Sequence, residues 1–144
     1  MVSGLPASGK STLAKLLGSE LGFEVLDKHF EMAARTPRNV ILVSHWRRFG
    51  DQLESGTPTD WLSEFSSVIE IACCCSTVTA VNRFTSRKRH PAHGDATKVA
   101  SELLPWFEAE NIKGPLGVGS LISVDTENFV DINKLAQECR EFFQ

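Results

Sequence analysis

Apolar residues in this chain fall into short unbroken runs separated by stretches with helical periodicity. Val40–Val43 is four consecutive β-branched or leucine residues without alternation, which is typical of a parallel strand buried on both faces. The runs Val68–Cys74 and Leu121–Val124 predict two further buried strands. Phe23–Leu26 predicts a shorter strand that ends in Asp27.

Between these strands the spacing of apolar residues changes to that of helices. A first helix is predicted from Lys10, and Gly22 follows it as a C-terminal stop. We expect later helices over 77–89, over 97–104 with a continuation from Pro105, and over 132–143, and a short helix capped by Asp60. Strands that alternate with helices predict an α/β fold with a parallel sheet, built as a single domain over residues 1–144. Met1–Ser3 reads as the tail of a first strand that is cut short.

Composition and charge narrow the classes of protein. The formal net charge is -3, which argues against a protein that wraps nucleic acid, and no apolar run approaches the length of a membrane helix. Cys73, Cys74, Cys75 and Cys139 lack the spacing of a zinc site and are expected to be free thiols in the core. With no secretory signal visible, we expect a cytoplasmic protein.

The segment Gly4–Thr12 carries the clearest chemistry. It reads GLPASGKST and matches the phosphate-binding loop pattern GxxxxGK[ST] between a strand and a helix. The pattern predicts that backbone N–H groups of this loop and the helix N-terminus surround the phosphates of a nucleoside triphosphate. Lys10 would reach the β- and γ-phosphates and Ser11 would bind Mg²⁺. The predicted cofactor-binding residues of the loop are Gly4, Pro6, Ala7, Ser8, Gly9, Lys10, Ser11 and Thr12.

Phosphoryl transfer also needs a group that deprotonates or orients the acceptor. Asp27 ends a strand at the carboxyl edge of the predicted sheet, where it could be the acceptor base, a metal ligand with Ser11, or simply a turn cap. Ser44 and His45 follow the next strand and could face the phosphates, while Arg47 or Arg48 could meet the acceptor. No acidic residue ends that strand, which argues against a motor-type ATPase.

A cationic stretch supplies candidates for the transferring phosphate. Arg83, Arg87 and His90 are spaced to share one face of the predicted helix, with Arg89 beside them. We expect a lid over about 83–95, in which Arg83 and Arg87 neutralise the γ-phosphate; the alternative is a solvated basic face.

The phosphate-binding loop, Asp27 and the arginine-rich stretch 82–93, in this order, resemble the small P-loop kinase-like ATPases related to gluconate kinase, chloramphenicol phosphotransferase and zeta toxin. The resemblance implies a three-layer fold with a five-stranded parallel sheet in the order 2-3-1-4-5, ATP with Mg²⁺, and transfer of the γ-phosphate to a small acceptor. It also implies that Asp125 and Thr126 lie near the adenine.

Three functions are consistent with these features. The first is a kinase that phosphorylates a small-molecule hydroxyl, with Lys10, Asp27, Arg83 and Arg87 as catalytic residues. The second is a catalytically weak nucleotide-binding switch or ATPase, which the short stretch 28–39 favours. The third is a polynucleotide 5′-kinase-like enzyme, against which the net charge of -3 counts.

Overall fold

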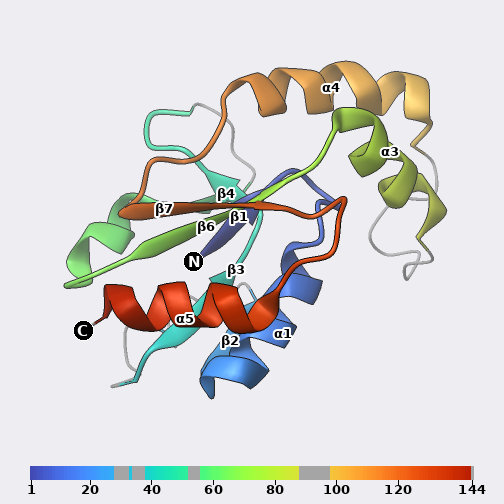
Figure 1. Cartoon of the computed structure of the whole chain (residues 1–144). Helices are drawn as coiled ribbons and strands as arrows, with labels where there is room; N and C mark the ends of the chain where they lie inside the picture. Colours follow the sequence, from blue (N-terminus) through green and yellow to red (C-terminus); the bar gives the residue numbers. More distant parts are fainter. Residues whose placement is uncertain (28–32, 34–37, 52–55, 88–97, 144) are drawn as a thin grey trace.

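The computed structural model describes residues 1–27, 33, 38–51, 56–87 and 98–143. Its centre is a five-stranded parallel sheet in the order β2-β3-β1-β6-β7 (Figure 1). The strands are β1 (Val2–Gly4), β2 (Glu24–Asp27), β3 (Val40–Val43), β6 (Ile69–Cys74) and β7 (Ser120–Asp125). Counted within this sheet alone, the order is 2-3-1-4-5, and the predicted α/β fold is confirmed.

Helices cover both faces of the sheet and make three layers (Figure 1). On one face lie α1 (Lys10–Leu21) and α5 (Ile132–Phe142); on the other lie α3 (Thr77–Ser86) and α4 (Ala100–Ile112). Each of the two helical layers has its own core. Val2, Leu17 and Ala136 are fully buried in the first, and Ala80 and Phe107 in the second. These helices therefore hold the sheet from both sides and leave its carboxyl edge as the place where loops gather.

Helix α1 ends as the sequence predicts. Gly22 adopts a left-handed conformation with φ 70°, and its N–H donates to the carbonyl of Gly18. A side chain at Gly18 would come within 2.5 Å of Val25, so this glycine lets the helix pack closely on β2. The strand that follows ends at Asp27, as predicted.

Helix α3 differs from its prediction in two ways. It begins at the cap residue Ser76, whose side chain accepts from the N–H of Thr79, but it ends at Ser86, so Arg87 lies beyond it in extended conformation. Arg83 and Arg87 therefore do not share a helical face. Helical spacing would place Val78 on the same inward stripe as Val81, yet Val78 is 57% exposed, and the buried residues of the helix are Ala80, Val81 and Phe84.

Other predicted details also change. Helix α4 begins at Ala100 and runs through Pro105 without interruption. Asp60 is the first residue of a 3-10 helix (Asp60–Glu64) and not its cap. All four cysteines are free; Cys73 and Cys139 are buried, whereas Cys74, the last residue of β6, is exposed. Within the described residues no helix is long and apolar enough to cross a membrane.

A second, two-stranded sheet follows β3 and was not predicted. It pairs β4 (Trp46–Arg47) with β5 (Thr57–Pro58), and the indole N–H of Trp46 ties it to the carbonyl of Val2 at 2.8 Å. Strands of two residues leave no periodic signal in a sequence. This small sheet matters because it fixes the residues that follow β3.

One buried carboxylate connects the sheet to the loop before β7. Glu70 is fully buried, and Ser3 donates its hydroxyl to Oε1 at 2.6 Å. The backbone N–H groups of Leu116, Gly117 and Val118 donate to the same carboxylate at 2.7 to 3.2 Å. Four donors satisfy the buried carboxylate, so the loop is held against β6, beside the strand that leads into Gly4.

Candidate functional site

The segment Gly4–Thr12 forms a loop whose backbone curls at the N-terminus of α1. Gly4 has φ 128° and Gly9 φ 94°, and Ala7 has φ 60°, a conformation that non-glycine residues rarely adopt. A side chain at Gly4 would come 2.5 Å from the carbonyl oxygen of Cys73 and 2.8 Å from Ser8 Oγ, so only glycine fits there. Positive φ at these three positions bends the backbone around the N-terminus of α1, and a bent loop at a helix N-terminus suits an anion such as phosphate.

Lys10 crosses the mouth of this loop. Its ammonium donates to the carbonyl of Leu5 at 2.7 Å and to that of Gly4 at 3.0 Å. Desolvation lowers the pKa of Lys10 to about 8; the nearby thiol of Cys73 opposes the shift and the charge of Arg87 adds to it. The cation therefore lies at the loop before any phosphate arrives, held by carbonyls that a phosphate can replace.

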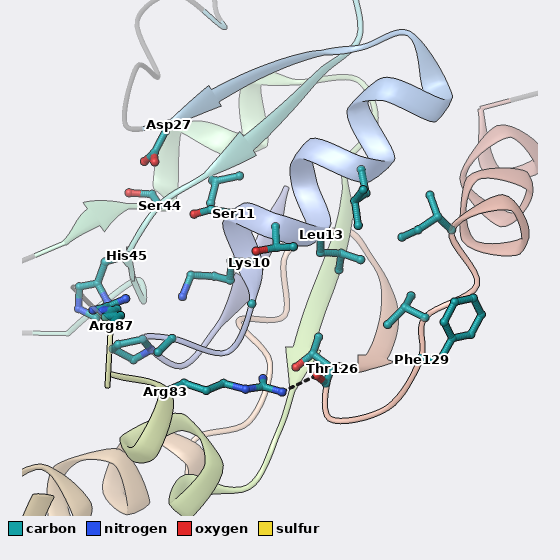
Figure 2. A pocket seen from close by; sticks show the side chains of 18 of the residues that line it. Lys10, Ser11, Leu13, Asp27, Ser44, His45, Arg83, Arg87, Thr126 and Phe129 are labelled. Atoms are coloured by element: carbon teal, nitrogen blue, oxygen red, sulfur yellow. Dashed lines mark hydrogen bonds between the residues drawn. The ribbon is translucent and has the colours of Figure 1, made fainter. Parts of the chain in front are cut away.

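A cavity of about 1180 Å³ opens in front of the loop (Figure 2). The figure shows Asp27, Ser44, His45 and Arg87 on one side of Lys10 and Thr126 and Phe129 on the other. We call the first side the β3 arm and the second the β7 arm. Side chains from segments far apart in the sequence line the cavity, among them Pro6, Ala7, Gly9, Lys10, Ser11, Thr12, Asp27, Ser44, His45, Arg83, Arg87, Thr126 and Phe129.

The β3 arm is built by adjacent strand ends. Asp27 is in register with Val43, so the carboxylate and the hydroxyl of Ser44 come side by side at the carboxyl edge of the sheet. Ser44 is buried, and its Oγ lies 2.5 Å from Oγ1 of Thr57 on β5. The second sheet thus fixes Ser44. Asp27 and Ser11, which the sequence suggests as metal ligands, line the same cavity.

Arg83 and Arg87 are both in the cavity wall but in different places. The guanidinium of Arg83 donates to the carbonyl of Thr126 at 2.9 Å, on the β7 arm. Arg87 stacks over the ring of Phe84 at 4.3 Å from its centroid, and its charge lowers the pKa of Lys10. The predicted lid over 83–95 lies largely outside the described residues, as do Arg89 and His90.

The β7 arm begins at Thr126. Its hydroxyl hydrogen-bonds the carbonyls of Ser8 at 2.7 Å and Cys74 at 3.0 Å, so β6 and the phosphate-binding loop are joined at this residue. Asp125 holds the following turn: its carboxylate accepts from the N–H of Glu127 and the side chain of Asn128, and these bonds lower its pKa. Of the two residues expected near the adenine, Thr126 is the one that lines the cavity.

Some lining residues were not predicted as functional. Leu16 belongs to the apolar stripe of α1, yet it is 52% exposed and lines the cavity with the 93% exposed Phe129. Helical periodicity assigns Leu16 to the core and cannot distinguish a stripe that faces a cavity. For Phe129 the sequence offers only its place shortly after a strand.

Arg48 lines a smaller cavity of about 120 Å³ beside the main one, together with Pro6 and His45. It donates to the carbonyls of Gly114 and Pro115, in the loop before β7, and lies outside the lining of the main cavity. The lining does not include Arg47 either.

A magnesium ion would find oxygen donors in the cavity. The hydroxyl of Ser11 and the carboxylate of Asp27 both line it, and such hard oxygen ligands suit Mg²⁺, which takes few protein ligands and completes its shell with water and phosphate. No group of three or more histidine, cysteine or acidic side chains that could hold a metal is present in the part of the chain that the structure describes. The donor set thus fits a magnesium ion that arrives with a nucleotide.

Comparison with known proteins supports the fold. A candidate kinase from Chloroflexus aurantiacus is similar over 99% of this chain and 96% of its own, with a TM-score of 0.76 and 23% identity. A deoxyadenosine kinase from M. mycoides has a TM-score of 0.56 at 17% identity, over 97% and 95% of the two chains. For a sugar kinase from Janibacter the values are 0.54 and 16%, over 99% and 91%. The chain therefore has a fold of the P-loop kinase type.

Neither a family model nor a curated protein matches the sequence.

Proposed function

We propose that this protein is a kinase that transfers the γ-phosphate of ATP to a hydroxyl group of a small molecule. The observation that carries the proposal is the single cavity that joins the phosphate-binding loop to Asp27 and Arg87. A nucleotide-binding site alone would not need a carboxylate and a guanidinium on the far side of Lys10. Structural similarity to kinases of nucleosides and sugars supports the same class of reaction.

Each side chain has a role that follows from its position. Lys10 and the loop N–H groups hold the β- and γ-phosphates, and Thr126 and Arg83 border the nucleoside. Asp27 accepts the proton of the acceptor hydroxyl as its oxygen attacks the γ-phosphorus; the bond to the bridging oxygen breaks, and ADP leaves. Arg87 neutralises charge on the transferring group. Mg²⁺, bound by Ser11 and Asp27, would supply further charge neutralisation.

A catalytically weak nucleotide switch is the second candidate. It is favoured by Ser44, a hydroxyl residue engaged with Thr57, at the end of β3 where a motor-type ATPase has a carboxylate. Such a protein would bind ATP and release little ADP whatever acceptor is present.

The experiment that tests both is an ATP·Mg²⁺ titration followed by ADP-release assays with a panel of hydroxyl compounds. Lys10→Ala should abolish saturable binding, because the loop loses its ammonium. Lys15→Ala is the matched control, since Lys15 is exposed on the same helix and lies outside the cavity lining. Stimulation of ADP release by one acceptor class supports the kinase, binding without stimulation supports the switch, and absence of binding overturns both.

A further inference from the structure

Phe129 is the most exposed large apolar side chain of the described residues, with 93% of its surface open to solvent. It lines the main cavity on the β7 arm, on the same side of Lys10 as Thr126 (Figure 2). Leu16 of α1 lines the same cavity and is 52% exposed. An aromatic ring that is open to water inside a cavity gains free energy when a flat apolar ligand covers it.

The turn that carries Phe129 is fixed at both ends. Before it, the carboxylate of Asp125 accepts from the backbone N–H of Glu127 at 2.9 Å. After it, the carboxylate of Asp131 accepts from the N–H of Lys134 at 3.0 Å and caps α5. These bonds hold the backbone in place before any ligand binds, so the ring is presented to the cavity with little ordering cost.

Polar side chains on the β7 arm are largely engaged already. The hydroxyl of Thr126 hydrogen-bonds backbone carbonyls of the phosphate-binding loop and of β6, Arg83 donates to the carbonyl of Thr126, and Asp131 caps a helix. Asn133 also lines the cavity, but its amide has both a donor and an acceptor and can turn to suit the edge of adenine or of guanine. Among the described lining residues of this arm, no side chain is therefore positioned for one base alone.

We propose that the base of the nucleoside triphosphate stacks on Phe129 beside Leu16, and that the protein binds ATP and GTP about equally well. Stacking on an aromatic side chain tolerates any base, because every base has an aromatic face. Purines have two fused rings and cover more of Phe129 than pyrimidines do, so CTP should bind more weakly.

The resemblance seen in the sequence implies Asp125 and Thr126 as neighbours of the adenine. In the structure the carboxylate of Asp125 holds the turn and the hydroxyl of Thr126 holds the phosphate-binding loop, so the apolar surface of Phe129 is left to contact the base. The inference rests on the nucleotide binding of the proposed kinase and names the class of its phosphate donor.

Calorimetric titration with the Mg²⁺ complexes of ATP, GTP, CTP and inorganic tripolyphosphate tests the proposal without an acceptor. Wild type should bind ATP and GTP within about threefold of each other and CTP about tenfold more weakly. Phe129→Ala should weaken the binding of ATP and GTP alike by about tenfold, because one stacked ring is lost. Its affinity for tripolyphosphate, which has no base, should stay within about twofold of wild type.

Two further variants serve as controls. Phe129→Trp should retain the affinity for ATP, since it keeps an aromatic ring. Phe49→Ala should bind ATP as wild type does, because Phe49 is 87% exposed but does not line the main cavity.

Three results would overturn the inference and leave the proposed kinase intact. One is unchanged ATP affinity in Phe129→Ala, and another is an equal loss of ATP and tripolyphosphate affinity, which would mean that the ring only supports the loop. The third is GTP binding to wild type more than about tenfold weaker than ATP binding. ATP binding with no acceptor that stimulates ADP release would instead overturn the kinase and leave the donor site standing.

Discussion

The two arms of the cavity are built differently. The β7 arm joins a contiguous phosphate-binding loop to Thr126, whose hydroxyl bonds to the carbonyl of Ser8 and ties the loop to the sheet. The β3 arm gathers Asp27, Ser44, His45 and Arg87 from three separate segments. In the proposed kinase, phosphate is bound mainly by backbone groups of one short segment, whereas acceptor chemistry depends on side chains that only the tertiary fold brings together.

Substitution of Asp27 should produce the largest effect that distinguishes the two arms. Asp27→Asn keeps the shape of the side chain but removes the base, so kcat should fall about 10³-fold. The dissociation constant for ATP measured without Mg²⁺ should change less than about threefold, because the phosphate-binding loop is untouched. Glu24→Gln, at the other end of the same strand, is the control. An unchanged kcat would show that Asp27 only caps a turn.

Arg83 and Arg87 allow a direct comparison of the two arms, because Arg83 lies on the β7 arm and Arg87 on the β3 arm. Arg87→Ala should lower kcat about 10²-fold with little change in the KM for ATP. Arg83→Ala should instead raise the KM for ATP about tenfold, because the guanidinium that holds the carbonyl of Thr126 is lost. Steady-state kinetics with ATP varied at saturating acceptor separate the two effects. Identical profiles for both variants would mean that the arms do not divide these tasks.

A smaller effect is expected in the pH dependence of ATP affinity, and it arises from Lys10 in the phosphate-binding loop. Desolvation lowers the pKa of Lys10 from 10.5 to about 8, and only the protonated form pairs with phosphate. ATP affinity should therefore fall as pH rises above about 8, by at most about tenfold per unit. Calorimetric titration between pH 7 and 9.5, in buffers of different ionisation enthalpy, should detect proton uptake on binding.

The same pKa shift predicts the pH dependence of stability. Between pH 8 and 10.5 the unfolded chain binds more protons at Lys10 than the folded one, so this residue's contribution to the free energy of unfolding rises with pH across that window. Lys10→Met should lack this contribution in urea denaturation. A difference between wild type and variant that stays constant with pH would contradict the shifted pKa.

How much the sequence predicts depends on how local the determinant is. Gly4–Thr12 carries its geometry in consecutive residues, and the end of β2 at Asp27 follows from a single apolar run, so these features could be read directly. The position of Arg87 could not be predicted in this way. Helical spacing continues past Ser86, whereas the chain adopts an extended conformation at Arg87. Local propensity alone does not set the end of a helix that packing also controls.

The second sheet shows the same limit. Trp46–Arg47 and Thr57–Pro58 are too short for periodicity, and their pairing joins residues 11 positions apart. Yet this sheet supplies Thr57, which holds Ser44 in the β3 arm. Aromatic residues near the cavity are equally hidden: Trp106 lies far along the chain from His45, and only packing brings their rings together.

The carboxylate of Glu70 also sets where this protein can be lengthened. Three consecutive N–H groups, from Leu116 to Val118, converge on one side chain, and a side chain at Gly119 would come 2.1 Å from the carbonyl oxygen of Val68. A peptide tag or a fused domain inserted between Gly114 and Gly119 would pull donors from a buried charge. Gly50 has open space around it and an exposed neighbour in Phe49, so it is the better place for such an insertion.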